Sequence, residues 1–492
     1  MFGHEMKPRP SLVNIGLIAV TLLLCYFPLC HRIEVNTIQL WDESRNATNA
    51  VEMLNNGHWF TRYFENNPDM WELKPPLLVW CQVLCLKIFG YKELAVRFPS
   101  MFFSMSTIIL LLWVGRKITG KIYAGAMASI ILVSCPGYIG EHATRFGDHD
   151  SMLTFFSTAL VCFSYIYFET RKTRYLILVF ISLFLGWATK SITIFMFAPT
   201  LFLWALLNNQ LKELLIKKSF WIGVISVLLL IVSYYLIREK TSPGYIEAVW
   251  QNEWFGRYFG TSKDFLIHKD PFWYYIIGFL NGRFTPYVFL LLAGAISLIA
   301  YKKMPFRKVL FFLILNWVLF LIIISAGSKN FWYDLPLYPI AALFLGILIY
   351  QLYFLLSQKW VRITFSIIFI MLFYSTYSIS FNSVFLPKKN SMDGWAKMSD
   401  YLRDGSNLKH GDFKIYYVDY NSPVYLYIEN AKSKHVTIDI ERLGKFKKGD
   451  RVVIAAPELS VKLDSLYITQ LIESKQGCDV KKVIGPKSPV TD

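Results

Sequence analysis

The chain has 492 residues, of which 54% are hydrophobic, 17% aromatic and only 17% charged. A typical soluble protein carries about 25% charged residues, so this composition excludes disordered, disulfide-scaffold and soluble globular proteins and indicates a chain whose solvent is lipid. The formal net charge of +17 would suggest nucleic acid in a soluble protein, and its meaning here depends on where the basic residues lie.

Long apolar runs recur through the first four-fifths of the chain. A helix of about 18 apolar residues is long enough to cross the roughly 30 Å of hydrocarbon in a bilayer. The sequence therefore predicts a mainly α polytopic membrane protein with about eleven spanning helices, at Pro10–Cys30, Phe98–Gly115, Ile122–Gly140, Ser151–Phe168, Tyr175–Thr189, Ser191–Leu211, Ser219–Ile237, Phe284–Tyr301, Val309–Ser328, Leu335–Ser357 and Ile363–Pro387.

Two further apolar segments are too short to span. Pro75–Gly90 has about 16 residues and begins with two prolines, which predicts an interfacial or re-entrant helix. Phe272–Gly282 contains a Trp-Tyr-Tyr cluster and predicts a second interfacial segment.

The basic residues fall mainly in alternate short loops between the expected spans. By the positive-inside rule these loops are cytoplasmic, which places the N-terminus in the cytoplasm and the C-terminus outside. Much of the positive charge is then a topology signal, and no nucleic-acid partner is expected. The loop residues are Lys7, Arg9, Arg116, Lys117, Lys121, Arg171, Lys172, Arg174, Lys212, Lys217, Lys218, Lys302, Lys303, Arg307, Lys308, Lys359 and Arg362.

The sequence divides into a transmembrane domain at 1–387, with a first external segment at about 31–97, and a C-terminal domain at 388–492. Strand-like runs at Lys414–Asp419, His435–Ile440 and Arg451–Ala456 alternate with helix-like stretches such as Leu459–Ser474. This alternation predicts a small external α/β domain.

Four acidic residues on the external side are candidates for chemistry. Asp42 and Glu43 open an amphipathic helix directly after the first span, where an acid either caps the helix or takes a proton. Asp148 and Asp150 lie at the outer end of another span. A carboxylate that leads into hydrocarbon has to be paired or hydrated, so both a cap and a catalytic role remain open.

Four basic residues lie outside, against the positive-inside bias: Lys74, Lys190, Arg257 and Lys329. A single such residue would be a snorkelling cation. Several at one membrane face favour a site for an anionic group at headgroup depth, with phosphate the first candidate.

These residues lie in a series of short motifs: WDESRNA, ELKPPL, ELAVRFPS, RFGDHDSMLTFF, GWATKSI, GRYF followed by HKDPFWYY, and SKNFWYDLPLYP. In this order they resemble the C-type integral membrane glycosyltransferases, in particular the bacterial relatives of protein O-mannosyltransferases (glycosyltransferase family 39) and the lipid A aminoarabinose transferases. The chain departs from the aminoarabinose transferase pattern at Leu73, where an acidic residue is common, and at the SKN element.

The resemblance implies an inverting transfer of a single sugar from a polyprenyl-phosphate carrier to a glycolipid or protein acceptor, on the periplasmic face of the inner membrane. It implies catalytic roles for Asp42 and Asp150, with Glu43 as the second acid of the first pair. Lys74, Arg257, Lys190 and Lys329 match basic positions near the lipid phosphate. Asp148, His268 and Arg45 are further candidates for the site.

This scheme requires no cofactor. His58, Glu65, His142 and His149 could chelate a divalent cation, but their spacing matches no standard site, which favours solvated or interfacial roles. An O-antigen-ligase-like or oligosaccharide transferase is the alternative enzyme. A transporter or flippase is the alternative outside enzymes, and it would bury ionisable groups near the bilayer midplane.

Overall fold

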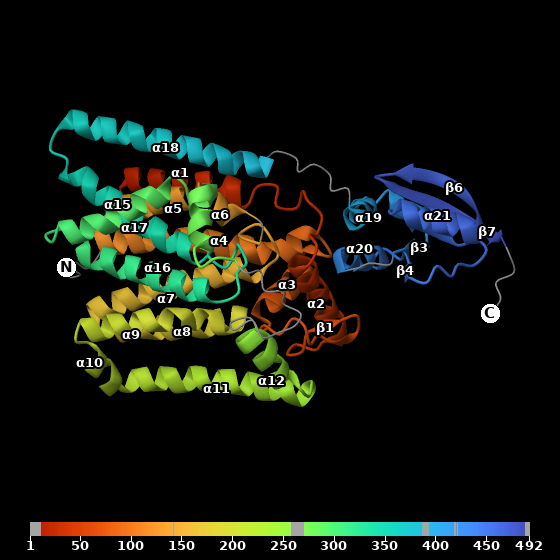
Figure 1. Cartoon of the computed structure of the whole chain (residues 1–492), viewed down its shortest axis with the longest axis horizontal. Coiled ribbons are helices and arrows are strands. Elements are labelled where there is room, and N and C mark those ends of the chain that lie inside the picture. The colour runs from red at the N-terminus through yellow and green to blue at the C-terminus, as the bar shows by residue number, and fades with distance from the viewer. Residues whose placement is uncertain are drawn as a thin grey trace.

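The structure, a computed structural model, describes residues 11–140, 142–256, 270–385, 393–417, 420 and 422–487. Figure 1 shows a bundle of long helices with a small sheet domain beyond one end of it. The short helices α2 (Asp42–Asn56) and α3 (Leu77–Phe89) lie at the same end of the bundle as the sheet domain, while α10 (Leu211–Ile216) lies at the opposite end. The short helices α2 and α3 and the sheet domain thus share one end of the bundle.

Eight helical segments among the described residues are long and apolar enough to cross a membrane. The predicted mainly helical, polytopic membrane fold is therefore confirmed. The eight are α1 (Leu12–Leu29), α4 (Glu93–Thr119), α7 (His149–Thr170), the run Thr173–Leu207, α11 (Lys218–Thr241), α16 (Arg307–Ala326), α17 (Leu337–Leu355) and α18 (Lys359–Phe385).

The other expected spans take different forms. Two of them are joined in the run Thr173–Leu207, which consists of α8 (Thr173–Lys190), the 3-10 helix η1 (Ser191–Phe197) and α9 (Ala198–Leu207). Ser191, with φ 50° and ψ −130°, interrupts that run. Two more are the short helices α5 (Tyr123–Val133) and α15 (Tyr287–Ala300), so the total of about eleven crossings stays a prediction.

The centre of the bundle is packed through small residues. A side chain at Gly125 of α5 would lie 2.6 Å from the backbone oxygen of Leu111 in α4, and one at Gly346 of α17 would lie 2.4 Å from that of Ala124. Small residues at such contacts let membrane helices approach closely. Close packing matters there because no hydrophobic driving force holds helices together in lipid. This packing fixes the helix ends from which the polar residues project.

The segments between the long helices are short and irregular. The strands β1 (Tyr63–Phe64) and β2 (Asn67–Pro68) form a small antiparallel pair between α2 and α3. Helix α3, predicted not to span, has 13 residues, or about 20 Å at 1.5 Å per residue, which is too short to cross the hydrocarbon of a bilayer. Other short elements are α6 (Pro136–Ile139), α12 (Tyr245–Ala248), η2 (Val249–Gly256), α14 (Tyr274–Gly278) and η3 (Phe279–Arg283).

The C-terminal domain is a five-stranded mixed sheet in the order β4-β3-β5-β7-β6. The expected helix at Leu459–Ser474 is correct only in its first half, because the chain turns into strand β6 at Tyr467, where YITQLIESK pairs antiparallel with β7. The elements are α19 (Gly394–Arg403), η4 (Asn407–His410), β3 (Phe413–Tyr416), α20 (Ser422–Lys432), β4 (Ile438–Glu441), β5 (Arg451–Ile454), α21 (Pro457–Leu466), β6 (Tyr467–Lys475) and β7 (Cys478–Pro486).

Polar side chains dock this domain onto the first external segment. The buried Tyr427 hydroxyl accepts from the backbone N–H of Ile38 at 2.9 Å and donates to Glu93 at 2.9 Å. Arg403 donates to the backbone oxygens of Glu34 and Val35. The domain is thus attached beside the N-terminus of α2.

Candidate active site

Asp42 is the first residue of α2, and its side chain remains 40% exposed. No side-chain hydrogen bond caps this helix, since the N-cap residue is Trp41. The carboxylate is therefore not used as a cap, and it lies 3.7 Å from Nδ1 of His142. Partial burial and then the charge of Asp148 raise the pKa of Asp42 above its ordinary value, which suits a carboxylate that has to accept a proton.

Asp148 contacts two histidines, His142 before it and His149 directly after it in the chain. Its side chain caps α7 by accepting from the backbone N–H of His149 at 2.6 Å, and it contacts Nδ1 of His142 at 2.9 Å. Burial alone would disfavour the charged forms of Asp148 and His142, but the attraction between these two charges outweighs it. The hydrogen bonds from His142 and His149 lower the pKa of Asp148 well below its usual range, and Asp148 raises the pKa of His142 to about 9.

The His142 ring is held both at its Nδ1 atom and on its apolar face. Its face stacks on Trp332 at a centroid distance of 3.9 Å. Trp332 lies in the SKNFWYD segment, about 190 positions further along the chain, so this contact joins two external segments. His142 is therefore fixed between Asp42 and Asp148.

Lys74 and its neighbours form a buried triad of charges. Both carboxylate oxygens of Glu72 accept from Nζ of Lys74 at 2.9 Å, and Arg62 lies 3.5 Å from the same carboxylate. These two cations hold the pKa of Glu72 well below its usual range despite full burial. With two cations and one anion, the triad Arg62–Glu72–Lys74 carries a net charge of +1.

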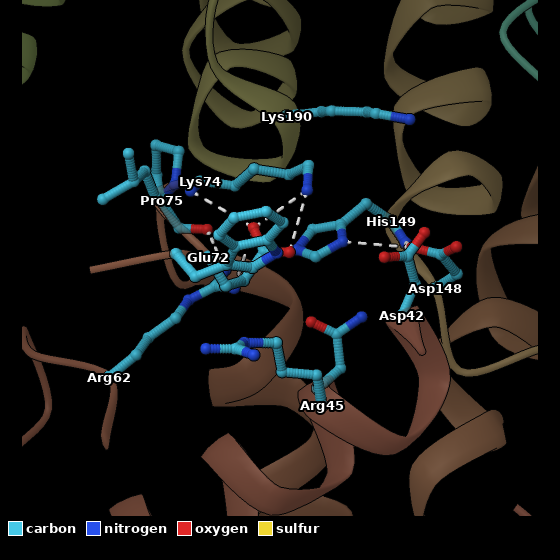
Figure 2. A network of polar contacts seen from close by, with 12 residues as sticks. Asp42, Arg45, Arg62, Glu72, Lys74, Pro75, Asp148, His149 and Lys190 are labelled. Carbon is cyan, nitrogen blue, oxygen red and sulfur yellow. Dashed lines mark hydrogen bonds and ion pairs between the residues drawn. The ribbon is translucent and has the colours of Figure 1, made fainter. Parts of the chain in front are cut away.

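Figure 2 shows the histidine that links this triad to the acidic group formed by Asp42 and Asp148. The His149 ring lies between Lys74 and Asp148, and its Nε2 is 3.2 Å from Nη2 of Arg62. Asp42 lies beside Asp148 in the same view, and Lys190 projects toward the group from another helix. Of the solvated or interfacial role expected for His149, the solvated one is wrong, because only 1% of this residue is exposed, and the interfacial one stays a prediction.

Asp150 and Lys190 form a buried ion pair between α7 and the end of α8. Nζ of Lys190 donates to the two carboxylate oxygens at 2.6 and 2.7 Å, and the side chains are 1% and 8% exposed. The ring centroid of Tyr333 lies 4.8 Å from the same ammonium. The pair lines a cavity of about 50 Å³ together with Tyr333 and Gly327, so the two charges border open space near the acidic group.

Glu43 occupies a different environment from Asp42. It is 1% exposed, and its oxygens accept from Arg97 at 2.7 and 2.8 Å and from the backbone N–H groups of Gln39 and Gly147, each at 2.8 Å. Every hydrogen bond joins a segment that borders the site. This geometry fits a positioning residue better than a group that exchanges a proton with substrate.

We expect Glu43→Gln to lower the free energy of unfolding by about 3–5 kcal/mol, because it leaves the buried Arg97 guanidinium without its counter-charge. The measurement is the thermal unfolding midpoint of the purified protein in detergent. Glu65→Gln is the matched control, since its pair with Arg442 is about half exposed, with side chains 45% and 47% exposed, and such pairs contribute about 0–1 kcal/mol. Equal shifts in the two variants would contradict the positioning role of Glu43.

The remaining predicted residues are placed less closely around Asp42. Arg45 makes a two-bond pair with Asp69, at 2.9 and 2.7 Å, which holds the first external segment together. Lys329 donates to the backbone oxygen of Gly327 at the edge of the cavity. Arg257 and His268 lie outside the described residues, so their roles stay predictions.

Asp42, His142 and Asp148 also meet the first requirement of a metal site. One ligand atom from each lies within 4.8 Å of the others, and two carboxylates with an imidazole suit a divalent cation. A cation held there would supply electrostatic stabilisation of negative charge. Asp148, however, already accepts from the backbone N–H of His149 at 2.6 Å and contacts Nδ1 of His142 at 2.9 Å. Its charge is therefore compensated by protein groups.

We therefore expect the sugar transfer that the family resemblance implies to survive dialysis of the purified protein against a chelator. The measurement compares product formation in excess EDTA with product formation after addition of Mg²⁺, Mn²⁺ or Zn²⁺. Activity that falls in EDTA and returns with one of these cations would instead assign the three side chains to a metal.

Two members of this site, Glu72 and Arg62, are not among the residues predicted from the sequence. Glu72 immediately precedes the Leu73 that departs from the family pattern, and its carboxylate supplies the acid two positions before Lys74 instead of one. That proximity was a usable signal. Arg62 offered none, because it is one basic residue in an external loop, and only the fold brings it to Glu72 and His149.

Comparison with known proteins supports this fold. A family model described as dolichyl-phosphate-mannose-protein mannosyltransferase matches residues 73–237. The chain is 29% identical over 337 residues to undecaprenyl phosphate-alpha-4-amino-4-deoxy-L-arabinose arabinosyl transferase 2 of Proteus mirabilis, covering 65% of this chain and 57% of that relative. The match thus spans little more than half the length of that relative.

Solved structures share the fold. ArnT from Cupriavidus metallidurans bound to undecaprenyl phosphate matches with a TM-score of 0.69 at 14% identity, over 95% of this chain and 97% of that one. The oligosaccharyltransferase AglB from Archaeoglobus fulgidus, in complex with an inhibitory peptide and a dolichol-phosphate, matches with a TM-score of 0.50 at 10% identity, over 87% and 64%. The resemblance to C-type membrane glycosyltransferases predicted from the sequence is confirmed.

Proposed function

We propose that this integral membrane protein is an inverting glycosyltransferase that moves one sugar from a polyprenyl-phosphate carrier to a glycolipid or protein acceptor. The observation that carries the proposal is the juxtaposition of an accessible carboxylate, Asp42, with the positively charged triad Arg62–Glu72–Lys74 at one end of the bundle. Relatives and fold neighbours whose names include undecaprenyl phosphate or dolichol-phosphate support the choice of donor.

In the proposed reaction an acceptor oxygen attacks the anomeric carbon from the face opposite the phosphate. The bond between that carbon and the phosphate oxygen breaks, and the electron pair leaves with the polyprenyl phosphate. Lys74 and Arg62 stabilise the growing negative charge, because preorganised cations in a water-poor site stabilise it without reorganisation. Asp42 takes the proton of a hydroxyl acceptor, and if the acceptor is already an anionic phosphate it orients that group instead.

The other charged residues take supporting roles in this proposal. Asp150 is the second acid, and Lys190 compensates its charge and borders the cavity beside it. Lys329 and Arg257 would contact the lipid phosphate as it departs. His142 and Asp148 hold the surroundings of Asp42, and Arg45 keeps the first external segment in place through Asp69.

The proposal places the site on the periplasmic face of the inner membrane, with the N-terminus in the cytoplasm. The basic residue Lys212 lies in α10, and Lys217 and Lys218 follow it directly, at the end of the bundle opposite α2 and α3 (Figure 1). Since basic loops stay in the cytoplasm, the end with α2, α3 and the sheet domain faces outward.

Mass spectrometry of lipid A and of exported proteins, from cells with and without the gene, tests this function. The expected result is the loss of one monosaccharide from one of these fractions and its return when the gene is restored. Loss of a whole oligosaccharide would favour the second candidate, an oligosaccharide transferase, for which the fold shared with AglB is the specific observation. Unchanged masses in both fractions would contradict the proposed function.

A further inference from the structure

Three aromatic rings and one guanidinium form a column beside Asp42. The rings of Trp41 and Tyr420 stack at 5.4 Å with an interplanar angle of 21°, and those of Tyr420 and Phe64 stack at 5.8 Å with an angle of 10°. Arg45 lies over Phe64, with Cζ 4.3 Å from the ring centroid. Trp41, Tyr420 and Phe64 are called the aromatic column below.

The column is assembled from distant parts of the chain. Trp41 and Phe64 belong to the first external segment, whereas Tyr420 belongs to the C-terminal domain. Near Tyr420, Ser422 Oγ at the start of α20 bonds to Thr48 Oγ1 in α2 at 2.8 Å. The docking of the C-terminal domain therefore sets the position of Tyr420 against Trp41.

Trp41 has two properties that its packing does not require. It remains 64% exposed although one of its faces is stacked on Tyr420, so much of the ring surface meets solvent. Its backbone has φ 71° and ψ −118°, a conformation unusual for a residue with a side chain and one associated with functional sites. The next residue in the chain is Asp42.

We propose that the aromatic column is the acceptor subsite and that it binds a saccharide, with one pyranose ring stacked on the exposed face of Trp41. The C–H groups of a pyranose present a weakly positive apolar face, which complements the negative face of an aromatic ring. A ring bound there places its hydroxyl groups near the carboxylate of the neighbouring Asp42. The inference rests on the proposed function and narrows its acceptor from glycolipid or protein to a molecule with a sugar headgroup.

This assignment gives the C-terminal domain a role in the reaction. The domain contributes Tyr420, which supports Trp41 from behind, and the polar groups of Arg45 and Asp69 lie at the other end of the column. A peptide acceptor would need main-chain donors and acceptors along its length, and flat ring faces supply none.

The test measures binding of two soluble probes to the full-length protein in detergent by saturation-transfer NMR. The probes are the disaccharide of N-acetylglucosamine and a Ser/Thr-containing peptide of similar mass. Binding of undecaprenyl phosphate to the same samples reports separately on the donor site. The variants are Trp41→Ala, Tyr420→Ala and Tyr420→Phe, with Trp59→Ala as the matched control, because Trp59 is a 43% exposed tryptophan of the same external segment.

We expect Trp41→Ala to weaken disaccharide binding by about tenfold, which corresponds to about 1.4 kcal/mol. Tyr420→Ala should weaken it less, while Tyr420→Phe and Trp59→Ala should bind as the unaltered protein does. Undecaprenyl phosphate binding should be the same in every variant, which also shows that each is folded.

Disaccharide binding that is unaffected by Trp41→Ala overturns the subsite, and so does preferential binding of the peptide. If the unaltered protein does not bind undecaprenyl phosphate, the donor of the proposed function is contradicted, while the saccharide result can still be interpreted. The two failures are thus distinguishable.

Discussion

Asp42→Asn should reduce the rate of sugar transfer to a hydroxyl acceptor by about 10²–10⁴-fold, the usual contribution of a general base. The asparagine keeps the shape of the side chain but cannot take the proton. The expected result is a fall in kcat with little change in the binding of undecaprenyl phosphate, because the cations of the triad Arg62–Glu72–Lys74 are untouched. The measurement is single-turnover transfer by purified protein supplied with lipid-linked donor.

The pH profile of the unaltered protein gives a second measure of the same assignment. A base works only when it is deprotonated, so activity should fall on the acid side as Asp42 gains a proton. Since burial and the charge of Asp148 raise the pKa of Asp42, this fall should occur above the pKa of about 3.9 of an ordinary aspartate. Asp42→Asn should remove the acid limb from its residual activity.

Asp479→Asn on the C-terminal domain is a suitable control, since among the described residues that carboxylate accepts from Ser460 and Ser474 of the same domain. Full transfer activity in Asp42→Asn would contradict the role of base. Loss of donor binding in the same variant would show that the carboxylate shapes the donor site.

The sequence was informative about the fold because hydrocarbon imposes strict limits on it. A spanning helix needs a long apolar run, so α4, α7, α11 and α16 were predictable, and only their ends differ from the structure. Prediction was poorer where the chain leaves the membrane. The strand β6 was expected to be helical because its apolar residues suit either period in a short segment, and pairing with β7 decides between them.

The site was predictable only in part, for a related reason. Lys74, Asp150 and Lys190 stand out because charges at these positions violate the preferences of a membrane protein, and Asp42 stands out through the family resemblance of its WDESRNA motif. That signal says nothing about partners. The pairing of Lys190 with Asp150 joins residues 40 positions apart, and Arg62 joins Glu72 and His149 through the fold alone.

Asp150 and Lys190 provide the sharpest test of whether such a buried pair is structural or functional. Lys190→Met should lower the free energy of unfolding by about 3–5 kcal/mol, because it leaves a carboxylate uncompensated in a buried position. Asp150→Asn should have a comparable effect by leaving the ammonium unpaired. The measurement is the thermal unfolding midpoint in detergent, taken with transfer activity on the same preparations.

The double variant Asp150→Asn with Lys190→Met separates the two roles. Removing both charges of a buried pair is often neutral or stabilising, so the unfolding midpoint should return close to that of the unaltered protein. Activity should stay at least about tenfold lower, since the charges of Asp150 and Lys190 no longer border the cavity. The matched control removes the exposed pair Lys475–Asp404, whose side chains are 39% and 33% exposed, and should change neither quantity.

A double variant that regains both stability and activity would reduce this pair to a structural device and leave the proton transfer to Asp42 alone. A double variant that regains stability alone would show that the charges act on the substrate. The comparison of single and double variants is decisive, because either single variant loses activity whether it damages the fold or the chemistry. Since both side chains are almost fully buried, water cannot screen the difference, and the two outcomes should be well separated.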